Sequence, residues 1–505
     1  ATICLFSPDD LDMATAKTGN WFNENPQRGR SNNSALLIRD KTSYEQFATL
    51  MESVKEYGEP GFVWSDSTEL MVNPCVEIGM WPVCEVTGES GWSFCNLCEI
   101  NGKKVKTEED FQIAAKAAAI IGTLQSGYDQ FDYLGDVTTR IVRREALLGV
   151  SITGMQDSPD ILFDAKLQRK MAKMILKVNE LIAAKIGVNV CARATCVKPA
   201  GTTSCILGTA SGIHAHHARR YIRRSQANYL EAPCRHFKEV NPTAVEKSVW
   251  SANGTDEVIA FCVEVPKGAK IKNDLDAITL LEHVKLTQQN WVTAGTREEA
   301  CTKPWLKHNV SNTITVRDGE WEEVTKYIFK NRRHFAGISL LPQSGDKDYP
   351  QAPFTAIYTP TELAKMYGDG MPMASGLVVD GLHEFDGNLW VACEEALSIT
   401  NLPEPDLPND PGDHGEQFAY EKKRMTWLSK KDWCRRVQQF ADRYLEGDAK
   451  QATYLMKDVH NWKLWCDLKR EYKNVDYTTL FEETDETKVS ETIACSGGAC
   501  DVSYA

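Results

Sequence analysis

Apolar residues recur at helical spacing in two long stretches of the chain. The segment from Glu108 to Gln130 contains the run AAKAAAII, and the segment from Ala165 to Ile186 repeats apolar positions at the same kind of interval. This spacing places apolar side chains on one face of a helix. We therefore expect two amphipathic helices that cover a buried layer of the fold.

Short apolar runs lie between the helical segments. ALLGVSITG from Ala146 and ATCVKPAG from Ala194 are typical of buried strands that enter glycine-containing loops. A further helix over Trp321 to Asn331 leads into the strand-like run HFAGISLLP, which Pro342 ends. Strands that alternate with helices predict an α/β fold.

The C-terminal part of the chain has a different composition. The stretch NLPEPDLPNDPGDHGEQ is rich in proline and acidic residues, which indicates a surface loop or linker. A charged amphipathic helix is predicted from Tyr420 to Leu445, and the polar, acidic end of the chain indicates a mobile tail. We predict an α/β body over residues 1–401, a linker and helical region over 402–481, and a flexible redox tail over 482–505.

Charge and hydropathy limit the partners that this chain can have. The longest apolar runs fall short of the roughly 18 residues that a membrane span needs, and the N-terminus lacks the pattern of a secretory signal. Asp and Glu number 70 against 57 Lys and Arg, a balance that argues against nonspecific binding to nucleic acid. Sixteen cysteines in such a chain favour thiol chemistry in a reducing compartment, the cytoplasm.

The segment NPCVEI carries the first candidate chemistry. Asn73, Cys75 and Glu77 occupy alternate positions, so in an extended loop their side chains would share one side. Such a trio can position a sugar hydroxyl, remove its proton with the carboxylate and use sulfur as the reacting atom. A plain turn without function is the alternative interpretation.

Cysteine pairs form the second group of candidates. Cys495 and Cys500, in ACSGGAC, can close a small disulfide loop on a flexible arm that carries reducing equivalents to a buried site. In FCNLCEIN, we interpret Cys95 as a redox thiol and Cys98 as its buried neighbour.

A zinc-stabilised interaction module is the non-enzymatic alternative. Its ligands would be Cys75, Cys84, Cys95 and Cys98. Structural zinc sites usually present two compact ligand pairs, and Cys75 with Cys84 is not one. The sequence therefore favours a redox role for these thiols.

Two further motifs are candidates for binding. In VKPAGTTSCILG, residues Pro199 to Thr203 offer backbone N–H groups and two hydroxyls at a strand end, which suits an anion, although a tight turn is the alternative. The histidines of GIHAHHARRYIRR, His214, His216 and His217, precede four arginines that would repel a cation. We expect these histidines to form hydrogen bonds or contact a partner, and we assign no metal site.

The chain resembles ribonucleotide reductases in a series of segments: GNWFNENPQRGRSNNSALL, NPCVEI, FCNLCEIN, KPAGTTS, SGIHAHHARRYIRR, SLLP and the terminal cysteine pair. It is most similar to the adenosylcobalamin-dependent class II enzymes of the monomeric ribonucleoside-triphosphate reductase type. The resemblance implies a ten-stranded α/β barrel with a central finger loop, of which residues 1–401 form the C-terminal part. Cys75 would become a thiyl radical that abstracts the 3′ hydrogen of the ribose. Glu77 would take the 3′ hydroxyl proton, and Asn73 would order the substrate hydroxyls.

The resemblance also implies how electrons and phosphates are handled. Cys95 matches one of two thiols that reduce the substrate. Cys495 and Cys500 match the tail pair that re-reduces the active-site disulfide and is itself reduced by thioredoxin or a similar protein. The substrate phosphates would be held by Ala200, Gly201, Thr202 and Thr203.

Part of the family pattern is missing from this chain. The partner thiol of Cys95, the first barrel strands and much of the site for a dNTP or ATP effector lie upstream of Ala1 in the family. We therefore interpret the chain as the C-terminal piece of a split or cleaved reductase that is active only with a separate N-terminal half. An open half-barrel exposes strand edges that must be covered.

The cofactor is inferred from the class of reductase. Class I enzymes relay the radical through adjacent tyrosines, and the sequence has no Tyr-Tyr pair and no glycyl radical motif. Adenosylcobalamin is what remains. A class I catalytic-subunit fragment that needs a metal-bearing radical subunit is the alternative, and the choice between diphosphate and triphosphate substrates stays open.

Overall fold

The computed structural model describes residues 2–94, 96–249, 251, 254–343, 351–367, 404–408, 412–445 and 449–480. Helices and strands alternate in this part of the chain, which confirms the predicted α/β class. Two compact units are present. Unit 1 contains the described residues of 2–218 and 265–343, and unit 2 contains those of 219–264 and 351–480.

A five-stranded sheet lies on one side of unit 1. Its strands follow the order β1 (Thr2–Phe6), β2 (Ser31–Ile38), β3 (Gly61–Ser65), β12 (Gly337–Pro342) and β11 (Thr313–Val316). The first three strands are parallel, β12 is antiparallel to β3, and β11 is parallel to β12. The strand β12 ends at the proline that the sequence predicts.

A second group of strands continues from β11. The strands β6 (Leu97–Asn101) and β7 (Gly149–Thr153) are parallel. Parallel bridges join Val150 to Thr195 and Val197 to Val310, three residues before β11 begins. These bridges connect the five-stranded sheet to the strands β7 and β6 through residues 194–198, which we call the 194–198 segment. The inner strand β7 is buried along its whole length, as expected for a parallel strand covered on both faces.

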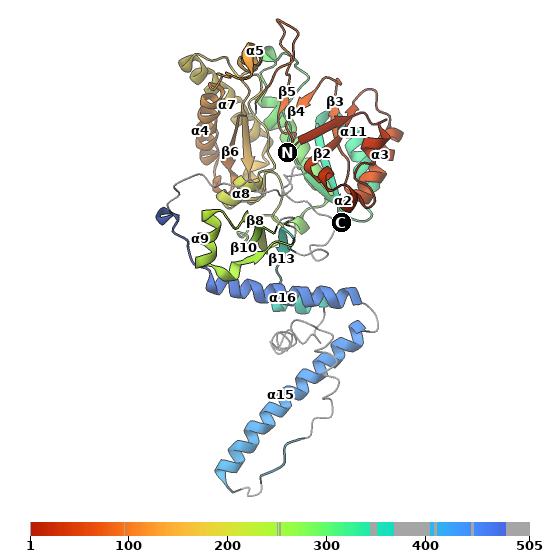
Figure 1. Ribbon diagram of the computed structural model, residues 1–505, viewed down its shortest axis with the longest axis vertical. Coiled ribbons are helices and arrows are strands. Elements are labelled where there is room, and N and C mark those ends of the chain that lie inside the picture. The colour runs from red at the N-terminus through yellow and green to blue at the C-terminus, as the bar shows by residue number, and fades with distance from the viewer. Residues whose placement is uncertain are drawn as a thin grey trace. The chain divides into compact units, whose positions relative to one another are not determined.

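Helices cover these strands (Figure 1). The helix α4 (Glu108–Ser126) lies beside α7 (Ala165–Ile186) and next to β6, while α3 (Tyr44–Tyr57) and α11 (Trp321–Asn331) lie near β2 and β3. These bounds confirm the helices predicted near Glu108, over Ala165–Ile186 and over Trp321–Asn331. The side chains of Thr107 and Asp110 form a capping box that starts α4.

The core of unit 1 lies between the helices and the strands. Phe47 of α3 packs against Phe62 and Trp64 of β3, with ring centroids 5.2 Å apart in both pairs. On the other side, Phe111 of α4 stacks on Trp291 at 5.8 Å. The remaining helices and strands of unit 1 are α1 (Leu11–Ala14), α2 (Trp21–Glu24), β4 (Met71–Val72), β5 (Gly79–Met80), α5 (Gly135–Glu145), α6 (Pro159–Leu162), α8 (Gly201–Leu207) and α10 (Ala277–Thr287).

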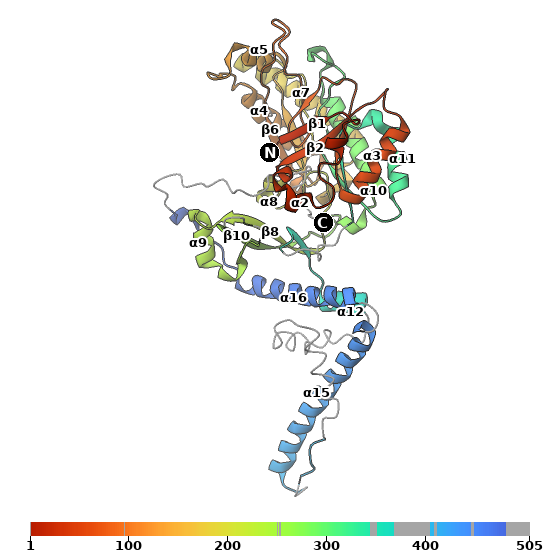
Figure 2. The ribbon, with the colours of Figure 1, turned by 45° about the vertical axis from the view of Figure 1, so that its right-hand side comes forward.

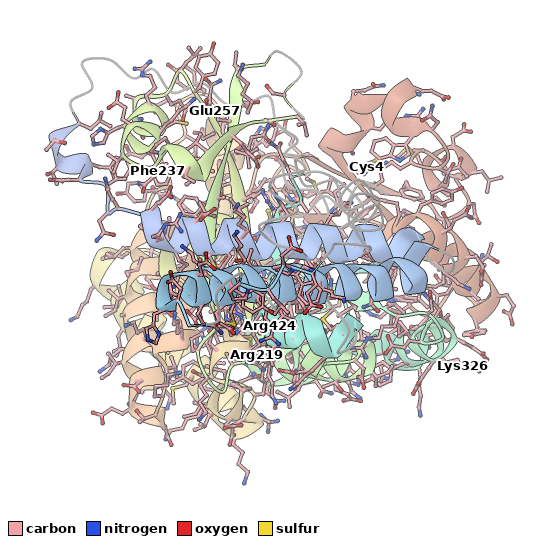
Figure 3. All side chains as sticks on the ribbon, turned by 90° about the horizontal axis from the view of Figure 1, so that it is seen from below. Cys4, Arg219, Phe237, Glu257, Lys326 and Arg424 are labelled. Atoms are coloured by element: carbon pink, nitrogen blue, oxygen red, sulfur yellow. The ribbon has the colours of Figure 1, made fainter. Side chains whose placement is uncertain are left out.

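Unit 2 is built on an antiparallel sheet (Figure 2). Its strands follow the order β13 (Phe354–Ala356), β8 (Arg220–Asn228), β10 (Asp256–Glu264) and β9 (Val245–Lys247), and its helices are α9 (Ala232–Val240), α12 (Pro360–Tyr367), α15 (His414–Leu445) and α16 (Ala449–Glu471). Phe237 of α9 belongs to the core of this unit, and Phe237 and Glu257 of β10 are labelled in Figure 3. Lys238, the residue after Phe237, pairs with Glu257. The predicted helix from Tyr420 to Leu445 is confirmed within the longer α15.

The two predicted domain boundaries lie in residues that the structure does not describe. The predicted boundaries at 401/402 and 481/482 fall within residues 368–403 and 481–505, so the three-part division stays a prediction. In the part of the chain that the structure covers, no helix combines the length and apolar character needed to cross a bilayer.

Candidate active site

The NPCVEI motif forms the tip of a small hairpin. The strands β4 and β5 pair antiparallel, and Asn73 to Ile78 connect them. The N–H of Val76 donates to the Asn73 carbonyl oxygen over 2.8 Å, and the N–H of Ile78 donates to Asn73 Oδ1 over 3.0 Å. The segment is therefore a tight turn, not the extended loop that the alternation predicts, because the Asn73 side chain closes it. We call residues 73–79 the 73–79 loop.

The centre of this loop has an unusual backbone conformation. Val76 has a φ of 63°, which costs a β-branched residue energy and persists only where neighbours enforce it. One such neighbour is Gly337 of β12. A Cβ at Gly337 would lie 2.7 Å from Val76 Cγ1, so glycine is needed for this close approach.

Three hydrogen bonds from other elements hold the backbone carbonyls of the loop, one from a backbone N–H and two from side chains. The N–H of Asn309 donates to the Glu77 carbonyl over 2.9 Å, and Ser311 Oγ donates to the Cys75 carbonyl over 2.6 Å. Asn32 Nδ2 of β2 donates to the Pro74 carbonyl over 3.2 Å. The loop is thus attached to both groups of strands through its backbone.

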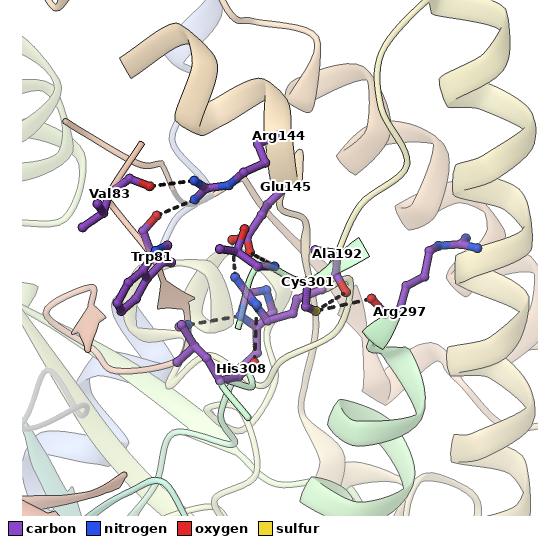
Figure 4. A network of polar contacts seen from close by, with 12 residues as sticks. Trp81, Val83, Arg144, Glu145, Ala192, Arg297, Cys301 and His308 are labelled. Carbon is purple, nitrogen blue, oxygen red and sulfur yellow. Dashed lines mark hydrogen bonds and ion pairs between the residues drawn. The ribbon is translucent and has the colours of Figure 1, made fainter. Parts of the chain in front are cut away.

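A buried polar network supports the base of the loop (Figure 4). Arg144, near the end of α5, donates to the carbonyls of Val83 and Trp81 over 2.6 and 2.8 Å. The next residue, Glu145, forms a buried ion pair with Arg193 and accepts from the Thr302 N–H over 3.0 Å. In the sequence, Arg144 and Glu145 are adjacent charged residues near a helix end, a pattern typical of the surface. The sequence therefore does not indicate that they support the loop.

Burial controls the electrostatics of the loop. Burial and the neighbouring Glu77 carboxylate raise the pKa of the Cys75 thiol to about 11, against the opposing charge of Lys198. Burial also raises the pKa of Glu77, which is fully buried. The nearby Asn73 side chain opposes this rise in pKa, but among the described residues no group meets hydrogen-bond geometry with either Glu77 carboxylate oxygen. The loop therefore offers a thiol that keeps its proton at neutral pH beside an unsatisfied carboxyl group.

The candidate phosphate-binding residues follow the 194–198 segment, which forms only isolated bridges and not the strand that the sequence predicts. Ala200 precedes α8, and Gly201, Thr202 and Thr203 form its first turn. The N–H of Val197 donates to the Asn309 carbonyl over 3.1 Å. Because Asn309 also donates to Glu77, one segment joins this turn to the 73–79 loop.

Two histidines of the GIHAHHARRYIRR motif form hydrogen bonds, which is the role expected for them from the sequence. His214 Nε2 accepts from the Thr313 N–H over 2.8 Å, and His216 Nε2 lies 2.8 Å from Asp157 Oδ1 in a buried pair. Over the described ranges, no group of three or more metal-binding side chains is present. Cys75, Cys84 and Cys98 are therefore not gathered into such a group.

Three of the predicted redox cysteines, Cys95, Cys495 and Cys500, lie outside the described residues. Cys98, three residues after Cys95, is half-buried on β6, with Sγ 3.2 Å from the Ala118 carbonyl oxygen. Burial and Glu99 raise the pKa of Cys98 to about 12. A pKa this high keeps the thiol protonated at neutral pH, and the role of Cys98 as a neighbour of Cys95 stays a prediction.

Curated relatives match the chain over about two thirds of its length. An adenosylcobalamin-dependent ribonucleoside-triphosphate reductase of Levilactobacillus brevis is 26% identical over 377 residues, which cover 67% of this chain and 47% of the relative. The corresponding enzyme of Lactobacillus acidophilus is 23% identical, covering 70% of this chain and 50% of the relative. A crystal structure of a B12-dependent class II ribonucleotide reductase matches with a TM-score of 0.56 and 20% identity, covering 71% of this chain and 52% of that chain. The chain is similar to class II ribonucleotide reductases in sequence and in fold. The resemblance inferred from the motifs is confirmed.

The extent of the match limits what it transfers. No protein-family model matches the chain. The chain spans about half the length of the curated class II reductases that it matches. Sequence reasoning missed the residues that hold the loop, namely Asn32, His308, Asn309 and Ser311. They are ordinary polar residues at distant positions, so only the tertiary structure reveals their contacts with the loop.

Proposed function

We propose that this chain is the catalytic part of a class II ribonucleotide reductase, which converts ribonucleoside di- or triphosphates to 2′-deoxyribonucleotides. The observation that carries the proposal is the 73–79 loop, in which a protonated, half-buried thiol lies beside a buried carboxyl group without a hydrogen-bond partner. A buried carboxyl group of this kind is suited to accept a proton from a bound hydroxyl.

The state of Cys75 fits the proposed cofactor. Adenosylcobalamin, when bound, supplies the radical chemistry that removes a hydrogen atom from a thiol. A thiolate carries no such hydrogen, whereas a thiol with a pKa of about 11 keeps it at neutral pH. The next two residues of the loop, Val76 and Glu77, are buried, and Cys75 itself is half-buried.

The three loop residues then divide the work on the ribose. The Cys75 sulfur accepts the 3′ hydrogen atom, and Glu77 accepts the 3′ hydroxyl proton. Asn73 Oδ1 accepts from the Ile78 N–H, and the Asn73 amide group, which lies near enough to Glu77 to lower its pKa, would donate to the substrate hydroxyls. The 2′ hydroxyl leaves as water.

The electrons come from two thiols that form one disulfide, which provides the two electrons and two protons that the overall reduction requires. We propose Cys95 as one of these thiols. Cys495 and Cys500 would exchange with the disulfide and pass the electrons on from thioredoxin or a similar protein. The phosphates of the substrate would contact Ala200, Gly201, Thr202 and Thr203, where Thr202 is exposed.

A partner chain would complete a ten-stranded barrel around the loop. In the described part of the chain, β1 and β6 have a neighbouring strand on one side only. The side chains of β6 are mostly half-buried, unlike those of the inner strand β7. Unpaired edges of this kind invite pairing with another chain. We propose that residues 1–401 contribute the C-terminal strands and that a separate N-terminal half contributes the others, the second thiol and most of the dNTP or ATP effector site. The reducing cytoplasm suits its free thiols.

The decisive experiment measures reduction of a ribonucleoside triphosphate with adenosylcobalamin and dithiothreitol. It compares this chain alone, a reductase N-terminal fragment alone and the mixture of the two. We expect deoxynucleotide only in the mixture. Cys75→Ser and Glu77→Gln should abolish it, whereas Cys262→Ser on β10 of unit 2 should not. Turnover by the Cys75→Ser variant would overturn the proposal, and activation by a metal-bearing subunit instead of cobalamin would favour class I.

The tail is tested with a pair of reductants. A variant with both Cys495→Ser and Cys500→Ser should keep its activity with dithiothreitol, because a small dithiol reaches the active-site disulfide directly. With thioredoxin as the reductant, the same variant should lose turnover. Equal loss with both reductants would contradict a shuttle role for the tail.

A further inference from the structure

Glu99 and Ser151, at the centres of the neighbouring strands β6 and β7, are connected by hydrogen bonds to each other and to Lys198. Glu99 of β6 lies opposite Ser151 of β7 in the register of the parallel pair. Ser151 Oγ donates to Glu99 Oε1 over 3.5 Å and accepts from the Lys198 N–H over 2.9 Å. The serine therefore joins a carboxyl group on one strand to the residue that ends the 194–198 segment.

Hydrogen bonds connect this group to the loop. Lys198 follows Val197, whose N–H donates to the Asn309 carbonyl, and the Asn309 N–H donates to the Glu77 carbonyl. The Lys198 ammonium is close enough to Cys75, Glu77 and Glu99 to lower the pKa of all three groups. Lys198 is thus a cation shared by the loop and by β6.

Glu99 adds a second carboxyl group to the site. Its Oε2 atom is buried without a hydrogen-bond partner, as are both oxygens of Glu77. Burial and the charge of Glu77 raise the pKa of Glu99, while the Thr203 hydroxyl and Lys198 oppose the rise. The titratable groups that act on the two carboxyls are Cys75 on the loop, Cys98 on β6 and Lys198. One ammonium therefore faces two carboxyl groups that cannot both be ionised at low cost.

We propose that Glu99 and Lys198 are positioning residues of the candidate active site, which set the protonation of Glu77 through opposed charges, one from β6 and one from the end of the 194–198 segment. Lys198 favours the ionised carboxylate that accepts the ribose proton. Glu99 opposes it, so the carboxylate does not become too weak a base. This inference rests on the proposed function for the role of Glu77, but the charge arrangement can be tested without turnover.

The first test uses alkylation of Cys75 by iodoacetamide at pH 8 on the full chain. The rate is followed by mass spectrometry of the peptide that contains Cys75, because the chain has other thiols. The thiolate is the reacting form, so below its pKa the rate changes about tenfold for each unit of pKa. Lys198→Met should slow alkylation by about 3- to 10-fold, because Lys198 lowers the pKa of Cys75. Glu99→Gln should change the rate less, because the carboxyl group that raises the pKa of Cys75 is Glu77.

Matched variants separate charge from structure. Lys198→Arg keeps the charge and should retain the wild-type rate. The exposed residues Lys326 and Glu322 form an ion pair on α11, and Lys326→Met and Glu322→Gln should leave the rate unchanged. The combined Glu99→Gln and Lys198→Met variant should fall between the two single variants. If all variants react within twofold of wild type, the charge arrangement is wrong.

The second test is the pH profile of kcat/KM for nucleotide reduction in the reconstituted enzyme. Removal of a neighbouring carboxylate lowers the pKa of Glu77, so Glu99→Gln should move the acid limb to lower pH. Lys198→Met should move the same limb to higher pH. A purely structural role would lower the rate without shifts of opposite sign. Wild-type inactivity would refute the proposed function but leave the alkylation result valid, whereas unshifted profiles in an active enzyme would overturn this inference alone.

Discussion

The N–H of Gly79 donates to Nδ1 of His308 over 3.1 Å, at the base of the candidate catalytic loop. Because Nδ1 accepts this bond, the ring proton is on Nε2, which donates to the Leu148 carbonyl over 2.8 Å. Burial, with the charge of Arg193, lowers the pKa of His308 to about 3. A neutral imidazole therefore joins the loop to the residue that precedes β7.

This pKa predicts how stability depends on pH. The folded state holds His308 neutral, whereas the unfolded chain binds a proton at a pKa of about 6.5, so stability is complete above about pH 6.5 and falls as the pH drops toward 3. This residue alone should cost about 2 kcal/mol of unfolding free energy between pH 7 and pH 5. The unfolding free energies of wild type and His308→Asn are measured in urea at pH 7 and pH 5. The loss of stability between the two pH values should be about 2 kcal/mol larger in wild type than in the variant. His414→Asn on the exposed start of α15 should behave like wild type.

Gly337→Ala should disturb the loop through Val76. The new Cβ would lie 2.7 Å from Val76 Cγ1, and overpacking of this kind costs about 1–3 kcal/mol. We expect lower stability in urea and slower nucleotide reduction. Addition of Val76→Ala removes the clashing atom and should restore part of both. A strictly additive double variant would show that the two residues do not press on each other.

Ser311→Ala should loosen the sulfur-bearing residue without unfolding the protein. The variant loses the bond from Ser311 Oγ to the Cys75 carbonyl, worth about 1 kcal/mol. Ser53→Ala is a matched control, since Ser53 Oγ donates to the Glu59 carbonyl over 3.1 Å on α3. Both variants should lose similar stability, and only Ser311→Ala should change the alkylation rate of Cys75. A changed rate in both variants would indicate a global effect.

Arg193→Met should be the most destabilising of these substitutions. It leaves the buried Glu145 carboxylate without its partner, and breaking such a pair costs about 3–5 kcal/mol. The midpoint of urea unfolding should fall accordingly. Combination with Glu145→Gln removes the stranded charge and should recover part of the loss. No recovery would mean that the packing of Arg193, not its charge, is what the fold requires.

Local sequence patterns determined much of the framework. The apolar spacing over Ala165–Ile186 matches α7 in full, because a helix buries one face and its periodicity is visible in the residues themselves. The bounds of α11 and the end of β12 at Pro342 follow from equally local signals. The antiparallel sheet of unit 2 was not predicted, since β8 lies in an arginine-rich motif without strand-like alternation.

The sequence by itself determined which reactive groups the loop carries, because Asn73, Cys75 and Glu77 are recognisable by type and spacing. Only the tertiary structure decided their state. The positive φ of Val76, the supporting bonds from His308, Asn309 and Ser311, and the charges of Lys198 and Glu99 all come from residues far away in the chain. A side chain's pKa and a strained backbone depend on burial and on neighbours in space, and local sequence carries neither.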